Sequence, residues 1–236
     1  MMNELDSSVF KRLGVLPTAV IGDTLREMGF HHQALNHKIA GLDRSMRCCG
    51  PAFCIEGETS VGDLPKNEPG ALIPSFEIFR RPLEDHVLVI ATGGFEGCPV
   101  WGGNIALSAQ LKRVAGVVAD GGVRDVVAIT EIGVPTWATF ITPVSSAKRW
   151  RITQFGSPIV MPGQTHSQVV ITPGDAIVAD ADGVMVVPAR LAQQVAESAE
   201  ELERIELVQR NELLSGDDRQ AVYERYDRFG HIPKTR

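Results

Sequence analysis

Two short, continuous apolar runs in the middle of the chain each end in a glycine turn. The first run, residues 87–91, ends at Thr92-Gly93-Gly94, and the second, residues 117–119, ends at Asp120-Gly121-Gly122. Continuous apolar runs of this length are typical of strands that are buried on both faces. We therefore predict two buried strands, each followed by a glycine turn.

Between these strands the apolar residues recur at helical spacing. Leu107, Leu111 and Val114 follow one another at intervals of four and three residues, and Gly116 ends the stripe. A further helix is expected to begin near Arg124. The alternation of strand, glycine turn and helix predicts a βαβα unit with parallel strands and crossover helices.

The N-terminal third of the chain predicts a helix, a strand and a long loop. Thr18 is expected to cap a helix that ends at Gly29. The apolar face of this helix consists of three residues: Ile21, Leu25 and Met28. Residues 51–55 read as a strand, and residues 57–70, which are polar and rich in Gly and Pro, predict an exposed or mobile loop.

Beyond Val134 the pattern changes to short β runs and then one long helix. The β runs cover residues 169–171, 176–179 and 184–187 and are separated by Pro-Gly-Asp and Ala-Asp-Gly turns. These turns predict antiparallel hairpins or a barrel-like return. A long helix is expected between residues 188 and 214, with one apolar face formed by Leu191, Val195, Ala199, Leu202 and Ile205.

Length, composition and charge limit the class of protein. The chain has 236 residues, and a usual domain has roughly 150. We expect one α/β domain over residues 1–214, with a helical C-terminal arm, and a charged extension over residues 215–236. The 44% hydrophobic content predicts a sizeable core. A net charge of −6 argues against a nucleic-acid partner, which needs clustered Lys and Arg, but it permits a small anionic substrate.

Neither a membrane span nor a disulfide scaffold is predicted. No apolar run approaches the roughly 18 residues of a transmembrane helix, and Glu4 and Asp6 stand where a signal peptide needs positive charge. We expect a cytoplasmic protein with no membrane partner. The chain has four cysteines: Cys48, Cys49, Cys54 and Cys98. They lack Cys-x-x-Cys spacing and are expected to be reduced and packed as small hydrophobic residues.

The candidate chemistry lies in the two glycine turns. Ligands of open α/β sheets bind beyond the carboxyl ends of strands, and residues 93–104 would present backbone N–H groups to a carboxylate or phosphate. Arg124 is a forked cation suited to a carboxylate or a developing enolate oxygen, and Asp125 is a hard oxygen ligand for Mg²⁺ or Mn²⁺. These features predict a site for a small 2-oxo acid. In the alternative interpretation, Arg124 and Asp125 simply cap a helix.

Several segments, taken together and in order, resemble the RraA-like family. They are Gly50-Pro51-Ala52-Phe53, Trp101-Gly102, residues 116–125 (GVVADGGVRD), Pro173-Gly174-Asp175 and residues 179–184. The resemblance extends from about Pro17 to about Gly216. This family contains class II aldolases acting on 4-hydroxy-4-methyl-2-oxoglutarate and 4-carboxy-4-hydroxy-2-oxoadipate, and it also contains the regulator of ribonuclease E activity.

The resemblance implies a fold, an assembly and a set of site residues. The fold would be an αββα sandwich resembling a swivelling domain, assembled as a homotrimer or homohexamer with active sites at subunit interfaces. Arg124 would stabilise a pyruvate enolate, and Asp125 would help to hold Mg²⁺ or Mn²⁺. The pyruvate carboxylate would be bound by the backbone around Gly102, Gly103, Asn104 and Ile105. Such a lyase would perform retro-aldol cleavage and oxaloacetate decarboxylation through the same enolate.

One position departs from the aldolase pattern, in which an acidic residue directly follows the glycine of the turn. Here that position is Gly103, followed by Asn104. The regulator branch is marked by loss of the Asp after the Arg, whereas this chain keeps Asp125. Three functions remain open: a metal-dependent lyase acting on a 2-oxo acid, a non-catalytic regulator that binds a protein partner, and another enzyme acting on an enolisable acid.

Overall fold

The structure, a computed structural model, describes residues 7–59, 75–146 and 149–234. Its helices are α1 (Ser7–Val15), α2 (Thr18–Glu27), α3 (Ser75–Ile78), α4 (Gly103–Leu111), α5 (Val126–Ile132), α6 (Ala192–Leu214) and α7 (Arg219–Arg225), with a short 3₁₀ helix at Ala189–Leu191. Its strands are β1 (Ala40–Gly41), β2 (Cys48–Thr59), β3 (Val87–Ala91), β4 (Pro99–Trp101), β5 (Gly116–Ala119), β6 (Gly122–Val123), β7 (Thr136–Ala138), β8 (Phe140–Ile141), β9 (Trp150–Phe155), β10 (Ile159–Pro162), β11 (Gln168–Ile171), β12 (Ala176–Ala179) and β13 (Val184–Val187). Most of the predicted loop, residues 60–70, lies outside the described residues. Its first three residues, 57–59, belong to β2.

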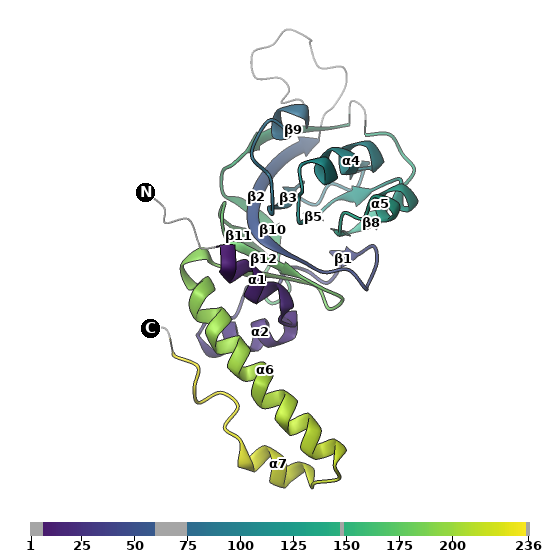
Figure 1. Cartoon of the computed structure of the whole chain (residues 1–236). Helices are drawn as coiled ribbons and strands as arrows, with labels where there is room; N and C mark the ends of the chain where they lie inside the picture. Colours follow the sequence, from purple (N-terminus) through teal and green to yellow (C-terminus); the bar gives the residue numbers. More distant parts are fainter. Residues whose placement is uncertain (1–6, 60–74, 147–148, 235–236) are drawn as a thin grey trace.

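A curled, mixed sheet forms the centre of the molecule (Figure 1). Its strand order is β1-β7-β5-β3-β2-β12-β13, with β9 also paired to β2. Strands β2, β3, β5 and β7 run parallel to one another. Every residue of β3 and β5 is buried, as expected for strands covered on both faces. The two predicted strands and the α/β class with C-terminal helices are thus confirmed.

The glycine turns lead first into two additional short strands and only then into helices. Strands β4 and β6 pair in parallel in a separate three-stranded sheet, in the order β4-β6-β8. Helices α4 and α5 begin just beyond these strands. The prediction that each glycine turn leads directly into a helix is therefore wrong. The sequence did not indicate these strands, because β4 has three residues and β6 has two, which is too short for a periodic pattern.

Helix α4 packs through small side chains instead of the predicted leucine stripe. It buries Ala106 and Ala109, whereas Leu107 is 47% exposed and Leu111 is 73% exposed. The helix approaches α5 closely, and a Cβ on Gly103 would lie 3.3 Å from the Cβ of Ala128. Because the two helices approach so closely, the face of α4 toward the core holds small side chains and the leucines lie outside.

Helix α2 has the predicted apolar face but a different N-terminal partner. Its first residue, Thr18, donates from its hydroxyl to Asp180 at 2.6 Å and from its backbone N–H to the same carboxylate at 2.9 Å. The expected capping role of Thr18 is therefore wrong, since the acceptor comes from the turn between β12 and β13. A carboxylate at a helix N-terminus accepts from the N–H groups that have no partner within the helix, and the positive end of the helix dipole stabilises its charge. Strands β12 and β13 pair in antiparallel register, as predicted.

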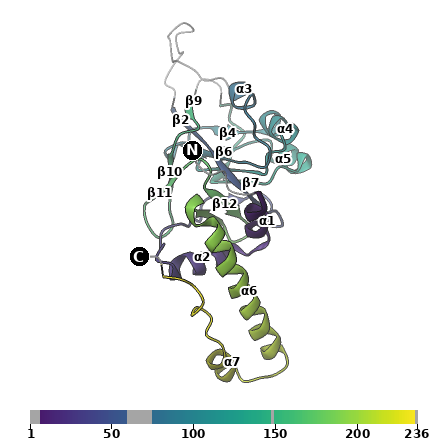
Figure 2. The ribbon, with the colours of Figure 1, turned by 60° about the vertical axis from the view of Figure 1, so that its left-hand side comes forward.

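Helix α6 extends away from the sheet, and the chain folds back beside it (Figures 1 and 2). All five residues of its predicted apolar face are buried. Arg12 of α1 donates two hydrogen bonds of 2.7 Å to Glu200 of α6. Beyond α7, Ile232 is buried in the same core cluster as α1, α2 and α6. No helix in the described part of the chain combines the length and apolarity needed to cross a membrane.

The four cysteines are unpaired. Cys48, Cys54 and Cys98 are buried, and burial raises the pKa of Cys54 to about 12. A thiol with such a pKa stays protonated at neutral pH and is a poor nucleophile. The cysteines therefore act as small packing residues, as expected.

Leu202 and Leu207 of α6 provide a matched test of the core. Leu202 is fully buried, whereas Leu207 is 49% exposed on the same helix. Replacing Leu202 by Ala should lower the free energy of unfolding by about 2–5 kcal/mol, because a buried cavity remains. Leu207→Ala should cost less than about 1 kcal/mol. Urea unfolding of both variants at equal protein concentration measures the difference, and equal losses would contradict this packing.

Candidate active site

The candidate site lies at the carboxyl ends of β4 and β6. Trp101 is paired with Val123 across these strands, and the backbone N–H of Arg124 donates to the carbonyl oxygen of Trp101 at 3.1 Å. This pairing brings Gly102 and Gly103 beside Arg124 and Asp125, where α4 and α5 begin. The site therefore lies beyond strand ends, as predicted, but at β4 and β6 and not directly at β3 and β5.

Asp125 links the two helices. It precedes α5 with a positive φ of 59° and makes no capping bond to its own helix. Its Oδ2 instead accepts a hydrogen bond of 3.1 Å from the backbone N–H of Gly103, the first residue of α4. Asp tolerates the left-handed region better than most residues, and strained backbone is often retained at functional sites. The alternative in which the pair caps a helix therefore holds in a changed form, because the Asp125 carboxylate serves the N-terminus of α4 and not that of its own helix.

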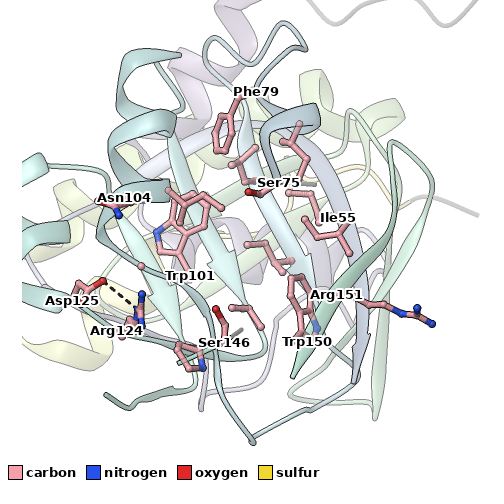
Figure 3. Close-up of a pocket in the computed structure, with 18 residues that line it drawn as sticks. Ile55, Ser75, Phe79, Trp101, Asn104, Arg124, Asp125, Ser146, Trp150 and Arg151 are labelled. Carbon is pink, nitrogen blue, oxygen red and sulfur yellow. Dashed lines mark ion pairs between the residues drawn. The ribbon is translucent and has the colours of Figure 1, made fainter. Parts of the chain in front are cut away.

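Arg124 lies beside this carboxylate and reaches the solvent. Its Nε lies 3.4 Å from Oδ2 of Asp125, and the two side chains are 40% and 47% exposed. An ion pair as exposed as this one adds little to folding stability. The ion pair keeps Arg124 beside Asp125 in the lining of the pocket shown in Figure 3.

A glycine at position 102 leaves room for the close approach of this ion pair. A Cβ there would lie 3.1 Å from Oδ2 of Asp125 and 3.2 Å from Cγ of Arg124. The φ of Gly102 is −165°, which is extended backbone open to any residue. Position 102 is therefore restricted by the space beside the ion pair and not by its backbone conformation.

The N-terminus of α4 offers donors to a bound anion. The first N–H groups of a helix have no intrahelical acceptor, and the first of the regular bonds runs from Ala106 to the carbonyl of Gly102. Gly103 donates to Asp125, while within the described residues the N–H groups of Asn104 and Ile105 have no acceptor. These two groups, aided by the helix dipole, can bind a carboxylate.

Asp120 holds the preceding glycine turn, a role that the sequence analysis missed. Its carboxylate accepts from the N–H of Thr92 at 2.5 Å and from the N–H of Gly94 at 3.3 Å. Some of the donors expected within residues 93–104 are thus already used. Burial raises the pKa of Asp120, against the opposing effect of these hydrogen bonds. The sequence feature that could have indicated this role is a single acidic residue placed directly after a buried strand.

A cavity of about 390 Å³ opens beside these residues (Figure 3). Its polar end is formed by Asn104, Arg124 and Asp125. The remaining wall is largely apolar and includes Ile55, Ile78, Phe79, Leu88, Ile90, Val100, Trp101, Ile105, Trp150 and Ile152. Sequence reasoning could not assemble this wall, because β2, β3, α3, β4 and β9 all contribute to it.

The site fits a hydrated divalent ion better than a metal fully enclosed by protein ligands. No group of three or more His, Cys, Asp or Glu among the described residues could hold a metal ion. Within that part of the chain Asp125 is the carboxylate that lines the cavity, and Asn104 adds an amide oxygen. Mg²⁺ usually takes one or two carboxylates and keeps several waters, so this donor set suits it.

Comparisons with known proteins agree with this architecture. A family model described as Aldolase/RraA, of the RraA-like family, matches residues 18–186. Protein DlpA of Legionella pneumophila is 31% identical over 75% of this chain, but the match spans only 27% of that protein. A Cupriavidus necator protein named "Putative 4-hydroxy-4-methyl-2-oxoglutarate aldolase" is 34% identical over 66% of this chain and 92% of its own.

Among solved structures, Streptomyces coelicolor RraAS2 superposes with a TM-score of 0.73 and 27% sequence identity. The alignment covers 87% of this chain and 98% of that one. That protein is described as an unusual member of the RNase ES inhibitor RraA protein family. The agreement extends over most of both chains and therefore supports the whole fold described above.

Asp120→Asn tests the buried carboxyl in the glycine turn. An unfolded Asp has a pKa of about 4, and burial raises the folded value. Stability from the protonated carboxyl is therefore present below pH 4 and is lost as the pH rises through the folded pKa. We expect the Asn variant to be destabilised by about 1–2 kcal/mol at pH 4, because the amide cannot accept from both N–H groups, and by less at pH 7.

Urea unfolding at several pH values between 4 and 7 measures this difference. Asp43→Asn is the matched control, because hydrogen bonds from Ser45 lower the pKa of the exposed Asp43 carboxyl. Its destabilisation should grow as the pH rises, opposite in sign to that of Asp120→Asn. A destabilisation at position 120 that also grows with pH would contradict the raised pKa.

Proposed function

The chain belongs to the RraA-like family, and on this premise we propose that it is a divalent-metal-dependent carbon–carbon lyase that cleaves a 2-oxo acid through a pyruvate enolate. It would resemble a 4-hydroxy-4-methyl-2-oxoglutarate aldolase and would also decarboxylate oxaloacetate. The observation that carries the proposal is the arrangement of Arg124, Asp125 and the α4 N–H groups around one cavity. The relative named as an aldolase supports the same reaction class.

The chain's own residues would bind the pyruvate half of the substrate. The N–H groups of Asn104 and Ile105 would hold its carboxylate, and the guanidinium of Arg124 would face the oxygen on C2. That oxygen gains charge when the C3–C4 bond breaks and its electron pair enters the enolate. A preorganised donor at this position stabilises the transition state more than the substrate.

Asp125 would hold the metal ion while the N–H of Gly103 fixes its orientation. A Mg²⁺ or Mn²⁺ ion bound there would supply a Lewis acid for the enolate charge. In retro-aldol cleavage the C4 hydroxyl gives its proton to water, the C4 fragment leaves as a carbonyl compound, and C3 of the enolate is then protonated. In oxaloacetate the same bond breaks with loss of carbon dioxide.

A homotrimer or homohexamer would explain the leucines that α4 leaves outside. Leu107 and Leu111 of α4 and Val127 of α5 are all large apolar residues, and the last two are each 73% exposed. These side chains lie on the two helices that form the site, so a second copy packed there would cover them and border the pocket. Apolar surface of this kind is typical of interaction sites.

Pyruvate release from oxaloacetate tests the proposed reaction. We expect release that depends on Mg²⁺ or Mn²⁺ and stops with EDTA, after correction for decarboxylation by the metal alone. Arg124→Ala should lower kcat/KM by about a hundredfold or more, since a preorganised charge donor is lost. Arg113→Ala is the matched control, because Arg113 pairs with Glu84 on the surface.

The negative outcomes separate the alternatives. Metal-dependent release that survives Arg124→Ala would remove the role assigned to Arg124. If no release exceeds the metal-only background, and pyruvate does not bind, the lyase proposal fails. A non-catalytic regulator that binds a protein partner would then be the better interpretation.

Gly102→Ala tests the space beside the ion pair. The added methyl group would press on Oδ2 of Asp125 and Cγ of Arg124 and should lower kcat/KM by about tenfold, because misplaced catalytic groups lose much of their effect. Gly22→Ala is the control, since its Cβ would meet Met185 at 3.6 Å and Ala favours a helix. Full activity of folded Gly102→Ala, judged by circular dichroism, would show that the ion-pair geometry does not matter.

A further inference from the structure

Three exposed histidines gather where the segment after α2 meets the turn between β10 and β11. The ring centroids of His32 and His166 lie 5.4 Å apart, with the ring planes tilted by 46°. The ring of His31 lies 6.3 Å from that of His32 in an edge-on arrangement. None of the three is among the described residues that line the cavity beside Arg124, so the cluster is separate from the candidate active site.

The two segments that carry these histidines are fixed to each other by hydrogen bonds. The backbone N–H of Gln164 donates to the carbonyl of Ala34 at 3.0 Å, and the N–H of Asn36 donates to the carbonyl of Pro162 at 3.0 Å. The side-chain oxygen of Gln164 accepts from the N–H of His37 at 2.9 Å. The backbone therefore brings the histidine rings together before any ligand binds.

Thr165 determines which ring nitrogen of His32 is available. The Thr165 hydroxyl donates its one hydrogen to the carbonyl of His31 at 2.8 Å. It can then only accept from Nδ1 of His32, which lies 3.1 Å away. Nδ1 of His32 therefore carries the proton, and Nε2 presents a lone pair. Metal-bound histidines almost always have this arrangement, in which the nitrogen away from the ion donates to a neighbouring acceptor.

Nδ1 of His166 is also occupied by the protein backbone. It lies 3.2 Å from the carbonyl oxygen of Gln168 and 3.4 Å from the backbone nitrogen of the same residue. We assign the shorter contact as the hydrogen bond, and it requires a proton on Nδ1 because a carbonyl oxygen can only accept. Among the described residues neither His32 nor His166 has a hydrogen-bond partner at Nε2. Both Nε2 atoms are thus free to bind an ion.

The spacing of these two rings suits one tetrahedral ion. An ion bound about 2.0–2.1 Å from a ring nitrogen lies about 3.2 Å from the ring centroid. Two rings at the tetrahedral angle then have centroids about 5.2 Å apart, close to the 5.4 Å between His32 and His166. The 6.3 Å between His31 and His32 would need a nearly linear angle, which zinc does not favour.

The ligand type selects a class of ion. Imidazole nitrogen suits Zn²⁺, Cu²⁺ and Ni²⁺, whereas Mg²⁺ prefers oxygen ligands. No group of three or more His, Cys, Asp or Glu in the described part of the chain could hold a metal ion, so water would fill the remaining positions. The four cysteines do not compete for such an ion. Burial raises the pKa of each thiol, and the thiolate is the form that binds a metal.

We propose that His32 and His166 bind one divalent transition-metal ion through their Nε2 atoms, at a surface site distinct from the Mg²⁺ or Mn²⁺ site proposed at Asp125. Thr165 and the backbone of Gln168 orient the two rings. The ion links the segment after α2 to the β10–β11 turn. It stabilises the folded chain, because the unfolded chain does not hold the two rings together. The proposal is independent of the reaction assigned to the cavity.

Calorimetric titration of the full, untagged chain with Zn²⁺ tests the site. The protein is first treated with EDTA and dialysed, and the buffer contains excess Mg²⁺ to occupy oxygen-ligand sites. We expect one zinc ion per chain to bind at the histidine pair. Zinc should also raise the Tm, since an ion that binds the folded chain stabilises it, whereas Mg²⁺ alone should not produce this rise.

Four variants assign the binding to residues. His32→Asn keeps a donor for Thr165 and removes Nε2. It and His166→Asn should each weaken zinc binding by about tenfold or more, since even loss of an outer partner costs about ten- to a hundredfold. Thr165→Val should weaken binding by about tenfold, and Thr165→Ser should restore it. His37→Asn is the matched control, because His37 is exposed on the same segment and its Nδ1 contacts Gln164.

The opposite outcomes would overturn the proposal. It fails if the parent chain binds no zinc, or if His32→Asn and His166→Asn bind zinc as tightly as the control does. Equal weakening by His31→Asn would show that the pair is wrongly assigned. Long-range ¹H–¹⁵N NMR of the imidazoles gives an independent measurement. We expect a proton on Nδ1 of His32 in the metal-free chain and zinc-induced shifts at Nε2 of His32 and His166. A proton on Nε2 of His32 would contradict the role of Thr165.

Discussion

The hydrogen bond from Gly103 N–H to the carboxylate of Asp125 joins the N-termini of α4 and α5, and the site depends on it. It uses the first donor of α4 and leaves the next two for an anion. Asp125 itself has a left-handed backbone conformation, and its side chain makes no bond to its own helix. Arg124 then lies beside the same carboxylate, in space that Gly102 leaves open. One bond between residues 22 positions apart thus brings the α4 donors, the guanidinium and the proposed metal ligand Asp125 together.

The same close approach explains where the large apolar residues go. Gly103 and Ala128 meet where the two helices approach each other, Ala106 and Ala109 are buried in the core, and the larger side chains of α4 lie outside. The exposed Leu107 and Leu111 are therefore a consequence of how the site is built. In the proposed homotrimer or homohexamer they would be buried against another copy, so site geometry and assembly would have a common cause.

Sequence reasoning succeeded where a short segment determines its own structure. The runs at β3 and β5 are buried over their full length. Arg124 and Asp125 both line the cavity, and their chemical roles stay predictions. Sequence reasoning failed where the partner is remote. Thr18 meets Asp180, which is 162 residues away, and Phe79 and Trp150 join the cavity wall from separate segments. Strands β4 and β6 are too short to carry a pattern, yet they bring the site together.

The glycine at position 103 and the apolar cavity wall change the site in the same direction. A side chain at position 103 would begin 3.3 Å from the Cβ atoms of Asp125 and Ala128, so an acid there would crowd the bond that joins the helices. The chain keeps the close helix contact and forgoes that carboxylate. The wall of the cavity beyond is largely apolar. In the proposed lyase, Arg124 and the α4 donors would then be the main electrostatic groups around the enolate. A water-poor cavity wall then strengthens these groups, because charges interact more strongly where fewer waters screen them.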